Sequence, residues 1–245
     1  MKPCLFLDLD DTIFQTMRKC PPGVRLENAA SSRDGTPLSF MTSGQTALFR
    51  LFSETMRVIP TTARNLDAFK RVHLPFKHGA ILNYGGVILD AEGNVDAEWD
   101  AEIRGKVMAV RGEMAALAAA IREYADRRAM ALTIRIIGDC AMELYIVIKQ
   151  PEADSTVLEN LHSEYVLGLT PADFYVHFND NNIAIIPRFL NKANAVKFLI
   201  EERLRPTDDS LVTLGMGDSL SDLRFMGVCD YLIAPSVSQI GRSLL

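Results

Sequence analysis

Pro3-Cys4-Leu5-Phe6-Leu7 leads straight into Asp8-Leu9-Asp10-Asp11-Thr12. A short apolar run of this kind is typical of an interior strand of a parallel sheet. Ligands of open α/β sheets bind just outside the carboxyl ends of such strands. In an ideal strand, Asp8 and Asp10 would leave on one face, because alternate side chains share a face, although we expect the strand to end between them. The segment therefore predicts an α/β fold with a parallel sheet and a reactive site at these two acids.

Two carboxylates this close suit covalent catalysis, in which one acid attacks while its neighbour handles protons. The alternative is an acidic strand-to-helix turn in which Asp11 or Thr12 serves only as a helix cap. This first cluster by itself leaves both interpretations open.

A second acidic cluster follows another apolar run near the other end of the chain. Leu211-Val212-Thr213-Leu214 precedes Gly215-Met216-Gly217-Asp218-Ser219-Leu220-Ser221-Asp222. A helix that starts near Ser219 would bring Asp218 and Asp222 to one side of its first turn. Carboxylates gathered at strand ends suit Mg²⁺, which takes oxygen ligands. A Gly-Asp turn with a helix cap is the alternative, but two acidic strand ends in one chain favour a magnesium site.

The two clusters resemble the first and last signature motifs of the haloacid dehalogenase (HAD) superfamily. Val58-Ile59-Pro60-Thr61-Thr62-Ala63-Arg64 resembles the strand ending in Thr-Gly-Arg of its sugar-phosphatase branch, although Ala63 replaces the glycine. Asp11 likewise replaces the glycine often found in D-x-D-G-T. Lys192, within residues 186–195, resembles that branch's lysine at a helix start. With four motifs in order, the chain is identified as a member of the type IIB cap branch, which holds Cof-like, sucrose-phosphatase and trehalose-phosphatase proteins.

The resemblance implies a role for each matched residue. Asp8 would be the nucleophile that forms an aspartyl-phosphate, and Asp10 the general acid that later activates water. Thr62 would hydrogen-bond the phosphoryl group, while Lys192 would neutralise its charge and hold Asp8. Phosphoryl transfer depends mainly on positioning and charge neutralisation, which this set supplies. The implied Mg²⁺ ligands are Asp8, Asp10 through its backbone carbonyl, Asp218 and Asp222, the last of which joins or positions the shell.

Several of these residues have simpler explanations. Thr62 would act as a helix cap if a helix begins near Ala63, and Lys192 would be an ordinary solvated lysine. Arg64 would either bind substrate or pair with a surface acid. The residues predicted to contact substrate are Thr12, Arg64 and Asn191.

The composition agrees with a soluble globular enzyme. The chain has 245 residues, of which 48% are hydrophobic and 23% charged. Its net charge of −5 and the lack of a clustered basic stripe argue against nucleic acid as a partner. No apolar stretch approaches the roughly 18 residues of a membrane span, and we expect no signal-like leader. We therefore expect a cytoplasmic protein without a membrane partner. The four cysteines have neither metal-site nor disulfide spacing.

The motifs divide the chain into a core and an insertion. Residues 1–83 and 187–245 carry them and form the expected Rossmann-like core of the HAD fold. Residues 84–186 predict an inserted α+β unit, with a helix from Ala97 to Arg128 that Gly112 would interrupt. In the family, an insertion at this place is a type C2B cap, which excludes water and selects the substrate.

Smaller elements are also predicted. Residues 20–40 are polar and rich in turn formers, which predicts a long loop or flap. Residues 46–55 predict a helix capped by Ser43 or Gly44. Residues 132–137 and 143–149 predict a hairpin joined by Gly138-Asp139. The candidate substrate contacts of the insertion are Arg135, Lys149, His177, Asn179 and Asn181.

Two classes of function remain open. The first is a Mg²⁺-dependent phosphatase that acts on a small phosphorylated metabolite, a sugar or polyol phosphate, as a monomer or weak homodimer. Asp10, two residues after the nucleophile, fits phosphatases and mutases rather than dehalogenases. A phosphomannomutase-like phosphomutase is therefore a close alternative, which product analysis would separate. A non-catalytic binding module that retains the fold is the other class, and it would gain support if Mg²⁺ failed to bind.

Overall fold

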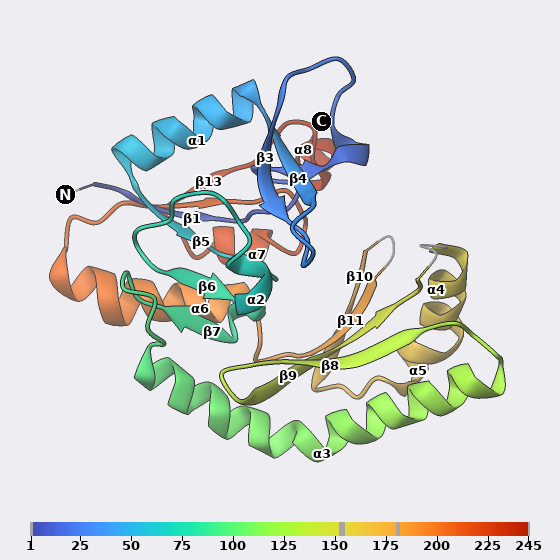
Figure 1. Ribbon diagram of the computed structural model, residues 1–245. Coiled ribbons are helices and arrows are strands. Elements are labelled where there is room, and N and C mark those ends of the chain that lie inside the picture. The colour runs from blue at the N-terminus through green and yellow to red at the C-terminus, as the bar shows by residue number, and fades with distance from the viewer. Residues whose placement is uncertain (1, 152–154, 180–181, 245) are drawn as a thin grey trace. The chain divides into compact units, whose positions relative to one another are not determined.

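The computed structural model describes residues 2–151, 155–179 and 182–244 (Figure 1). Contacts group the chain into two compact units, residues 1–97 with 191–245, and residues 98–190. These bounds differ from the predicted core of residues 1–83 and 187–245 and the predicted insertion of residues 84–186. The physical reason is that β7 (Val87–Leu89) pairs with β6 (Ala80–Leu82). This pairing ties the start of the predicted insertion to the first unit.

The first unit is built on a four-stranded sheet in the order β13-β12-β1-β5. All three strand pairs are parallel, and the central β1 is fully buried. Leu7 at the end of β1 lies beside Met216 and Pro60 of its two neighbours. The carboxyl ends of these strands therefore meet at one edge of the sheet, as the sequence predicts. The strand bounds are β1 (Cys4–Leu7), β5 (Arg57–Pro60), β12 (Thr213–Met216) and β13 (Tyr231–Ile233).

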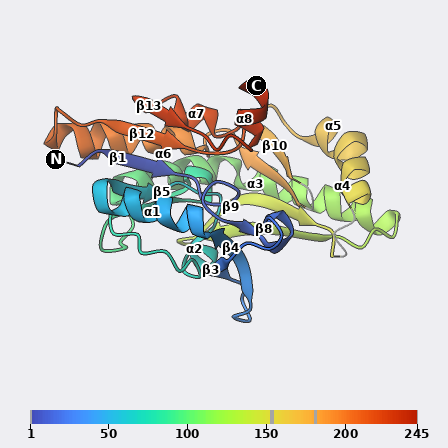
Figure 2. The same cartoon turned by 90° about the horizontal axis from the view of Figure 1, so that it is seen from above.

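Helices cover both faces of this sheet. Figures 1 and 2 show α1 (Ser43–Thr55) on one face, with α6 (Lys192–Phe198) and α7 (Leu223–Met226) on the other. Phe49 and Phe52 of α1 pack into the core formed with the residues of β1. Burial of apolar side chains on both faces explains why β1 has a continuous apolar sequence.

The start of α1 corrects a prediction. Thr42, rather than Ser43 or Gly44, is the N-cap residue. Its hydroxyl accepts from the backbone N of Gln45 at 3.3 Å, and the Gln45 side chain accepts in turn from the backbone N of Thr42 at 2.9 Å. This reciprocal capping box satisfies two backbone donors. The helix therefore begins three residues before the predicted start at Thr46.

The stretch predicted as a long loop or flap forms a small antiparallel sheet in the order β2-β4-β3. Its strands are β2 (Gln15–Thr16), β3 (Leu26–Ser31) and β4 (Pro37–Thr42). Ser39 and Met41 of β4 are buried while their neighbours are more exposed. Alternate burial in so short a strand is a weak sequence signal, which explains why the hairpin was not predicted.

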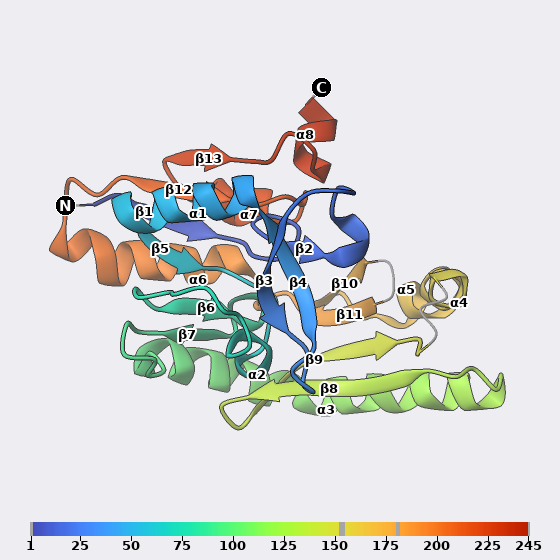
Figure 3. The same cartoon turned by 45° about the horizontal axis from the view of Figure 1, so that its top comes forward.

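The second unit carries a four-stranded antiparallel sheet in the order β10-β11-β9-β8. Met114, Ile121 and Leu158 of its helices form one hydrophobic core with the strands, and Figure 3 shows α3 running along the sheet. Gly112 does not interrupt α3, because packing outweighs the roughly 1 kcal/mol cost of one glycine. The bounds are α3 (Ala97–Arg127), β8 (Thr133–Asp139), β9 (Met142–Lys149), α4 (Ser155–Leu161), α5 (Leu167–Leu169), β10 (Phe174–Asn179) and β11 (Asn182–Pro187).

The turn between β8 and β9 lies two residues later than predicted. Cys140 and Ala141 form it, with φ angles of 52° and 57°. Two successive left-handed residues match the type I′ turn of a two-residue hairpin. Gly138 instead lies at a shift in strand register, so the predicted Gly138-Asp139 turn is wrong.

The remaining elements are short. They are the helices α2 (Leu66–Phe69) and α8 (Gln239–Leu244), the 3₁₀ turns η1 (Met17–Lys19), η2 (Asn83–Gly85) and η5 (Arg205–Thr207), and the π-helical segments η3 (His162–Val166) and η4 (Leu199–Leu204). Within the described ranges, no helix combines the length and apolar character needed to cross a bilayer.

Candidate active site

Three acids converge at the carboxyl edge of the parallel sheet. Asp8 follows β1 and Asp218 follows β12, while Asp222 comes from the turn after Asp218. One carboxylate oxygen from each lies within 4.8 Å of the other two. The predicted helix start near Ser219 is wrong, because α7 begins only at Leu223. A turn, closed by the Asp222 backbone N donating to Ser219 O at 3.0 Å, brings Asp222 into the cluster.

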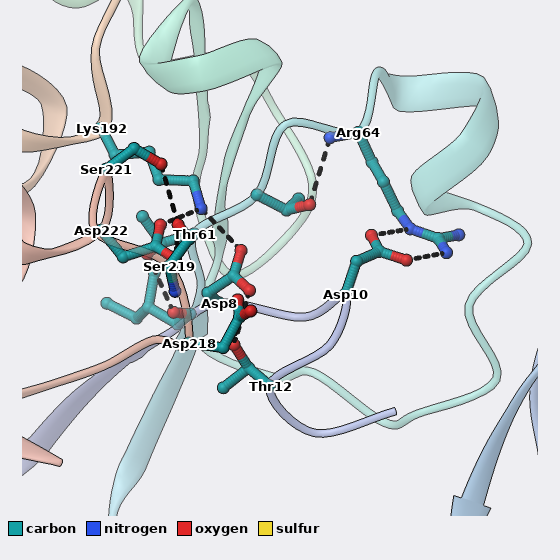
Figure 4. A network of polar contacts seen from close by, with 12 residues as sticks. Asp8, Asp10, Thr12, Thr61, Arg64, Lys192, Asp218, Ser219, Ser221 and Asp222 are labelled. Atoms are coloured by element: carbon teal, nitrogen blue, oxygen red, sulfur yellow. Dashed lines mark hydrogen bonds and ion pairs between the residues drawn. The ribbon is translucent and has the colours of Figure 1, made fainter. Parts of the chain in front are cut away.

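Lys192 joins two of these acids (Figure 4). Its Nζ donates to Asp8 Oδ1 at 2.6 Å and to Asp222 Oδ1 at 2.8 Å. Lys192 is the first residue of α6, where the helix dipole disfavours a cation. The two carboxylates offset this effect. Asn191 Oδ1 accepts from the backbone N of Asn194 at 2.9 Å, so Asn191 caps the helix that presents Lys192, and its predicted substrate contact stays a prediction.

Thr12 lies between Asp8 and Asp218. Its Oγ1 is 2.7 Å from Asp8 Oδ2 and 3.3 Å from Asp218 Oδ1. A hydroxyl has one proton to donate, and the shorter distance indicates that Thr12 donates it to Asp8. The strand β2 follows Thr12 rather than a helix, so Thr12 orients the first acid instead of capping a helix. Asp11 has a φ of 65°, which explains why glycine is common at this place in the motif.

Burial raises the pKa of two acids. The pKa of Asp8 rises to about 7 because burial disfavours its charge, and Asp222 adds to the rise while Lys192 opposes it. The pKa of Asp218 rises to about 6, first through burial and then through repulsion by Asp222 and Asp11. A cation bound beside them would favour the charged form of both acids.

The charges of Lys192 and Asp222 stabilise each other. Burial opposes the charge of Lys192, but the attraction of Asp8 and Asp222 outweighs it and raises the pKa of Lys192. Burial likewise disfavours the charge of Asp222, yet Lys192 and Ser219 lower the pKa of Asp222. Asp222 is therefore a carboxylate that holds Lys192 beside Asp8.

Thr62 lies at the end of the next strand and is buried. Its Oγ1 accepts from the backbone N of Arg64 at 3.1 Å. The capping alternative for Thr62 is wrong, because α2 begins at Leu66 and Asn65 Oδ1 caps it through the backbone N of Ala68 at 2.9 Å. The Thr62 hydroxyl accepts in this turn and retains a proton to donate.

Asp10 is bound by Arg64 instead of joining the other acids. Arg64 Nε donates to Asp10 Oδ2 and Arg64 Nη2 to Asp10 Oδ1, both at 2.7 Å. Figure 4 shows the Asp10 side chain turned toward Arg64 and away from Asp8. β1 ends at Leu7, before Asp8 rather than between the two acids as predicted, and the chain turns through the left-handed Asp11, so Asp8 and Asp10 do not share one face. Arg64 pairs with an acid, as one of its two interpretations predicts.

The remaining contacts of the site involve Ser219, Gly217 and Ser39. Ser219 donates to Asp222 Oδ2 from its Oγ at 2.7 Å and from its N at 3.2 Å. A Cβ at Gly217 would lie 2.5 Å from the Cβ of Asp222, so this glycine allows the close approach. Ser39 Oγ is 3.4 Å from Arg64 Nη2. Ser39 belongs to none of the four motifs, and its local sequence does not identify it as a residue of the site.

The donor set fits a hard divalent cation. Three carboxylates and one ammonium group leave two net negative charges in a partly buried place, which Mg²⁺ would neutralise. Both oxygens of Asp222 already accept from Lys192 and Ser219. Asp8 Oδ2 and the Asp218 carboxylate face a common neighbour in Thr12. This arrangement favours Asp8 and Asp218 as ligands and Asp222 as a positioning residue.

The candidate contacts of the second unit lie on its strands. Arg135 is on β8, Lys149 on β9, and His177 and Asn179 on β10. Asn181 lies outside the described residues. Their contact with substrate stays a prediction.

No family model and no curated protein sequence matches the chain. A sucrose-phosphatase from Synechocystis sp. PCC6803, solved with sucrose and phosphate, is 16% identical, with 99% of this chain and 95% of that one covered at a TM-score of 0.56. The C-terminal domain of the C. albicans trehalose-6-phosphate phosphatase is 14% identical, with 93% and 74% covered at 0.54. A trehalose-6-phosphate phosphatase related protein is 15% identical, with 94% and 85% covered at 0.50.

The chain shares the haloacid dehalogenase-like fold of these sucrose-phosphatase and trehalose-6-phosphate phosphatase structures. The resemblance drawn from the four motifs is confirmed at the level of the fold.

Proposed function

We propose that this protein is a Mg²⁺-dependent phosphatase that hydrolyses a sugar or polyol phosphate through an aspartyl-phosphate intermediate on Asp8. One observation carries the proposal: Asp8 is buried at the end of the central strand, with one oxygen bonded to Lys192 and the other to Thr12. A carboxylate oriented by a cation and a hydroxyl is placed to attack phosphorus. The names of the structural neighbours, a trehalose-6-phosphate phosphatase and a sucrose-phosphatase, support the substrate class.

Each residue then has a chemical task. Asp8 forms a bond to phosphorus while the bond to the leaving oxygen breaks, and Asp10 protonates that oxygen. Lys192 offsets the negative charge shared by the phosphoryl group and Asp8, and Thr62 donates a hydrogen bond to a phosphoryl oxygen. When bound by Asp8 and Asp218, Mg²⁺ would supply further charge neutralisation. Asp10 next accepts a proton from the water that releases phosphate from Asp8.

The second unit, residues 98–190, is proposed to select the substrate. Its α+β architecture matches the cap expected from the resemblance, and the neighbours that share this fold cover it along with the core. The core residues above recognise only a phosphoryl group and a cation. Selectivity among sugar phosphates must therefore come from other residues.

The test is release of phosphate from a panel of sugar and polyol phosphates, with and without Mg²⁺. Asp8→Asn keeps the size of the side chain but removes the nucleophile, so we expect it to abolish release. Asp209→Asn, an exposed acid outside the cluster, is the matched control and should behave as wild type. Mg²⁺-independent turnover, or full turnover by Asp8→Asn, would contradict the proposal. Phosphate moved within the sugar, without release, would identify a mutase instead.

A further inference from the structure

The guanidinium of Arg64 is held by the body of the first unit. Its Nη2 is 3.4 Å from Ser39 Oγ, and its Nη1 donates to Ala68 O at 3.5 Å. Its Cζ lies 5.0 Å from the centre of the Phe14 ring, a cation–π distance. The Arg64 side chain is 12% exposed, whereas that of Asp10 is 50% exposed. Arg64 is thus the fixed partner of the pair and Asp10 the partner that solvent reaches.

This pairing opposes the task proposed for Asp10. Both Asp10 oxygens accept from the planar fork of Arg64, which is a specific two-point arrangement. In that orientation the Asp10 side chain points away from Asp8 (Figure 4). An acid that protonates the leaving oxygen must approach the phosphorus that Asp8 attacks. Asp10 therefore has to leave Arg64 before it acts.

We infer that Arg64 is a positioning residue that holds Asp10 in a resting orientation, and that the first chemical step requires this pair to open. The inference rests on the proposed function. In that step the bond from Asp8 to phosphorus forms and the bond from phosphorus to the leaving oxygen breaks. Asp10, which takes up a proton from solvent once it leaves Arg64, gives that proton to the leaving oxygen. The water that later attacks the aspartyl-phosphate gives a proton to Asp10, which loses it to solvent when the pair with Arg64 re-forms, so the enzyme is regenerated.

The pair is able to open because solvent reaches Asp10. Its two-point geometry strengthens it, but water screens the half-exposed carboxylate, so the open orientation should be populated within about tenfold of the paired one. Removing Arg64 should therefore raise the open fraction, and with it the rate of any reaction that needs Asp10, by about two- to fivefold. A reaction that does not need Asp10 should not respond.

Two kinds of substrate separate these cases. An alkyl phosphate has a poor leaving group that needs a proton, whereas p-nitrophenyl phosphate releases a phenolate that does not. The readout is the ratio of kcat/KM for an alkyl phosphate to kcat/KM for p-nitrophenyl phosphate. Because each variant supplies both values, partial unfolding or a weaker phosphate site cancels in the ratio.

The variants are Arg64→Gln, Arg64→Lys and Asp10→Asn, with Arg71→Gln as control. Arg71 follows Arg64 by seven residues and pairs with Asp67, an acid that is not among the proposed site residues. We expect the ratio to rise about two- to fivefold in Arg64→Gln. It should rise less in Arg64→Lys, which keeps the charge but loses the fork, and stay unchanged in Arg71→Gln. Arg64→Lys also serves if Arg64→Gln does not fold.

The Asp10→Asn variant separates the two proposals. We expect it to lower the ratio about 100-fold, as loss of a general acid does. If it does so while the Arg64 variants leave the ratio unchanged or lower it, the inference about Arg64 is wrong and the proposed function stands. If Asp10→Asn leaves the ratio unchanged, Asp10 is not the acid, and the proposed mechanism and this inference both fail.

Discussion

At the residue scale, the site is a balance between Lys192 and the acids around it. Lys192 bonds to Asp8 and Asp222, and all three side chains are largely buried. Breaking a buried ion pair by removing one partner is costly, because the remaining charge has neither water nor a counter-ion. The same contacts that orient Asp8 therefore also stabilise the first unit.

Lys192→Met should lower the free energy of unfolding by about 3 kcal/mol at pH 8, because two buried acids lose their counter-ion. Phosphatase activity should fall at least about 100-fold, since Lys192 also offsets the phosphoryl charge. Urea denaturation and phosphate release measure the two effects. Lys197→Met, an exposed lysine on the same helix, should change neither. Equal stability of Lys192→Met and wild type would contradict the proposed charge balance.

The raised pKa of Asp218 makes stability depend on pH. This pKa rises from 3.8 to about 6 on folding, so the folded state binds more protons than the unfolded state between these values. Stability therefore falls as pH rises from about 4 to about 6, because the charged acid is disfavoured in the folded protein. The proposed cation would relieve this penalty.

In the absence of metal, Asp218→Asn should stabilise the protein above pH 6. We expect a gain on the order of 1 kcal/mol, discounted because Asp218 is partly exposed and screened by water. The gain should vanish near pH 4, where Asp218 is protonated in both states. Urea denaturation with EDTA at pH 4 and pH 7.5 tests this. A gain that is equal at both values, or larger at pH 4, would contradict it.

At the element scale, local strain lies in the turn from β8 to β9. Ala141 has a φ of 57° and no side-chain polar group to favour that conformation. A left-handed residue with a Cβ costs about 1 kcal/mol or more relative to glycine. The pairing of β8 with β9 therefore requires a left-handed conformation that alanine disfavours, and the hydrogen bonds of the long hairpin compensate for that cost.

Ala141→Gly should raise the free energy of unfolding by about 0.5 kcal/mol, since relief of strain exceeds the added freedom of the unfolded chain. Ala116→Gly, on the exposed side of α3, should lower it by about 1 kcal/mol, because glycine is a poor helix former. Urea denaturation of both variants gives the comparison. Destabilisation by Ala141→Gly would show that the left-handed turn costs this hairpin nothing.

At the scale of the whole molecule, the site joins distant parts of the chain. Asp8 and Asp218 follow adjacent strands although about 210 residues separate them. The unfolded chain does not hold them together, so a cation bound by both stabilises only the folded state. Such a ligand raises stability by mass action.

Mg²⁺ should therefore raise the thermal midpoint of the wild-type protein, with a stabilisation of about 2.7 kcal/mol at a concentration 100-fold above Kd. Asp218→Asn should lose this response, because one of the two proposed ligands is gone. Asp209→Asn should keep it. Calorimetry across a range of Mg²⁺ concentrations is the measurement, and a full response by Asp218→Asn would rule out the site.

Much of the fold and part of the site could be predicted from local patterns. The apolar run of Cys4–Leu7 predicts a buried parallel strand, and the acids after it and after residue 214 predict where the site lies. The strand and these acids are predictable because they depend on residues close in sequence, whose periodicity and backbone preferences act wherever the segment lies in the fold. The family resemblance, rather than a local pattern, implied Lys192 at a helix start, and it lies there.

The tertiary structure decided which side chains meet. Asp10 pairs with Arg64, 54 residues away, instead of standing beside Asp8. Asp222 reaches the cluster through a turn that the absence of a Cβ at Gly217 permits. Such contacts depend on how strands from opposite ends of the chain pack, and on which charges burial leaves to neutralise one another. Strand packing and the burial of charges arise only when the chain folds. The strands and their acids were therefore predictable from the sequence, but the partner of each acid was not.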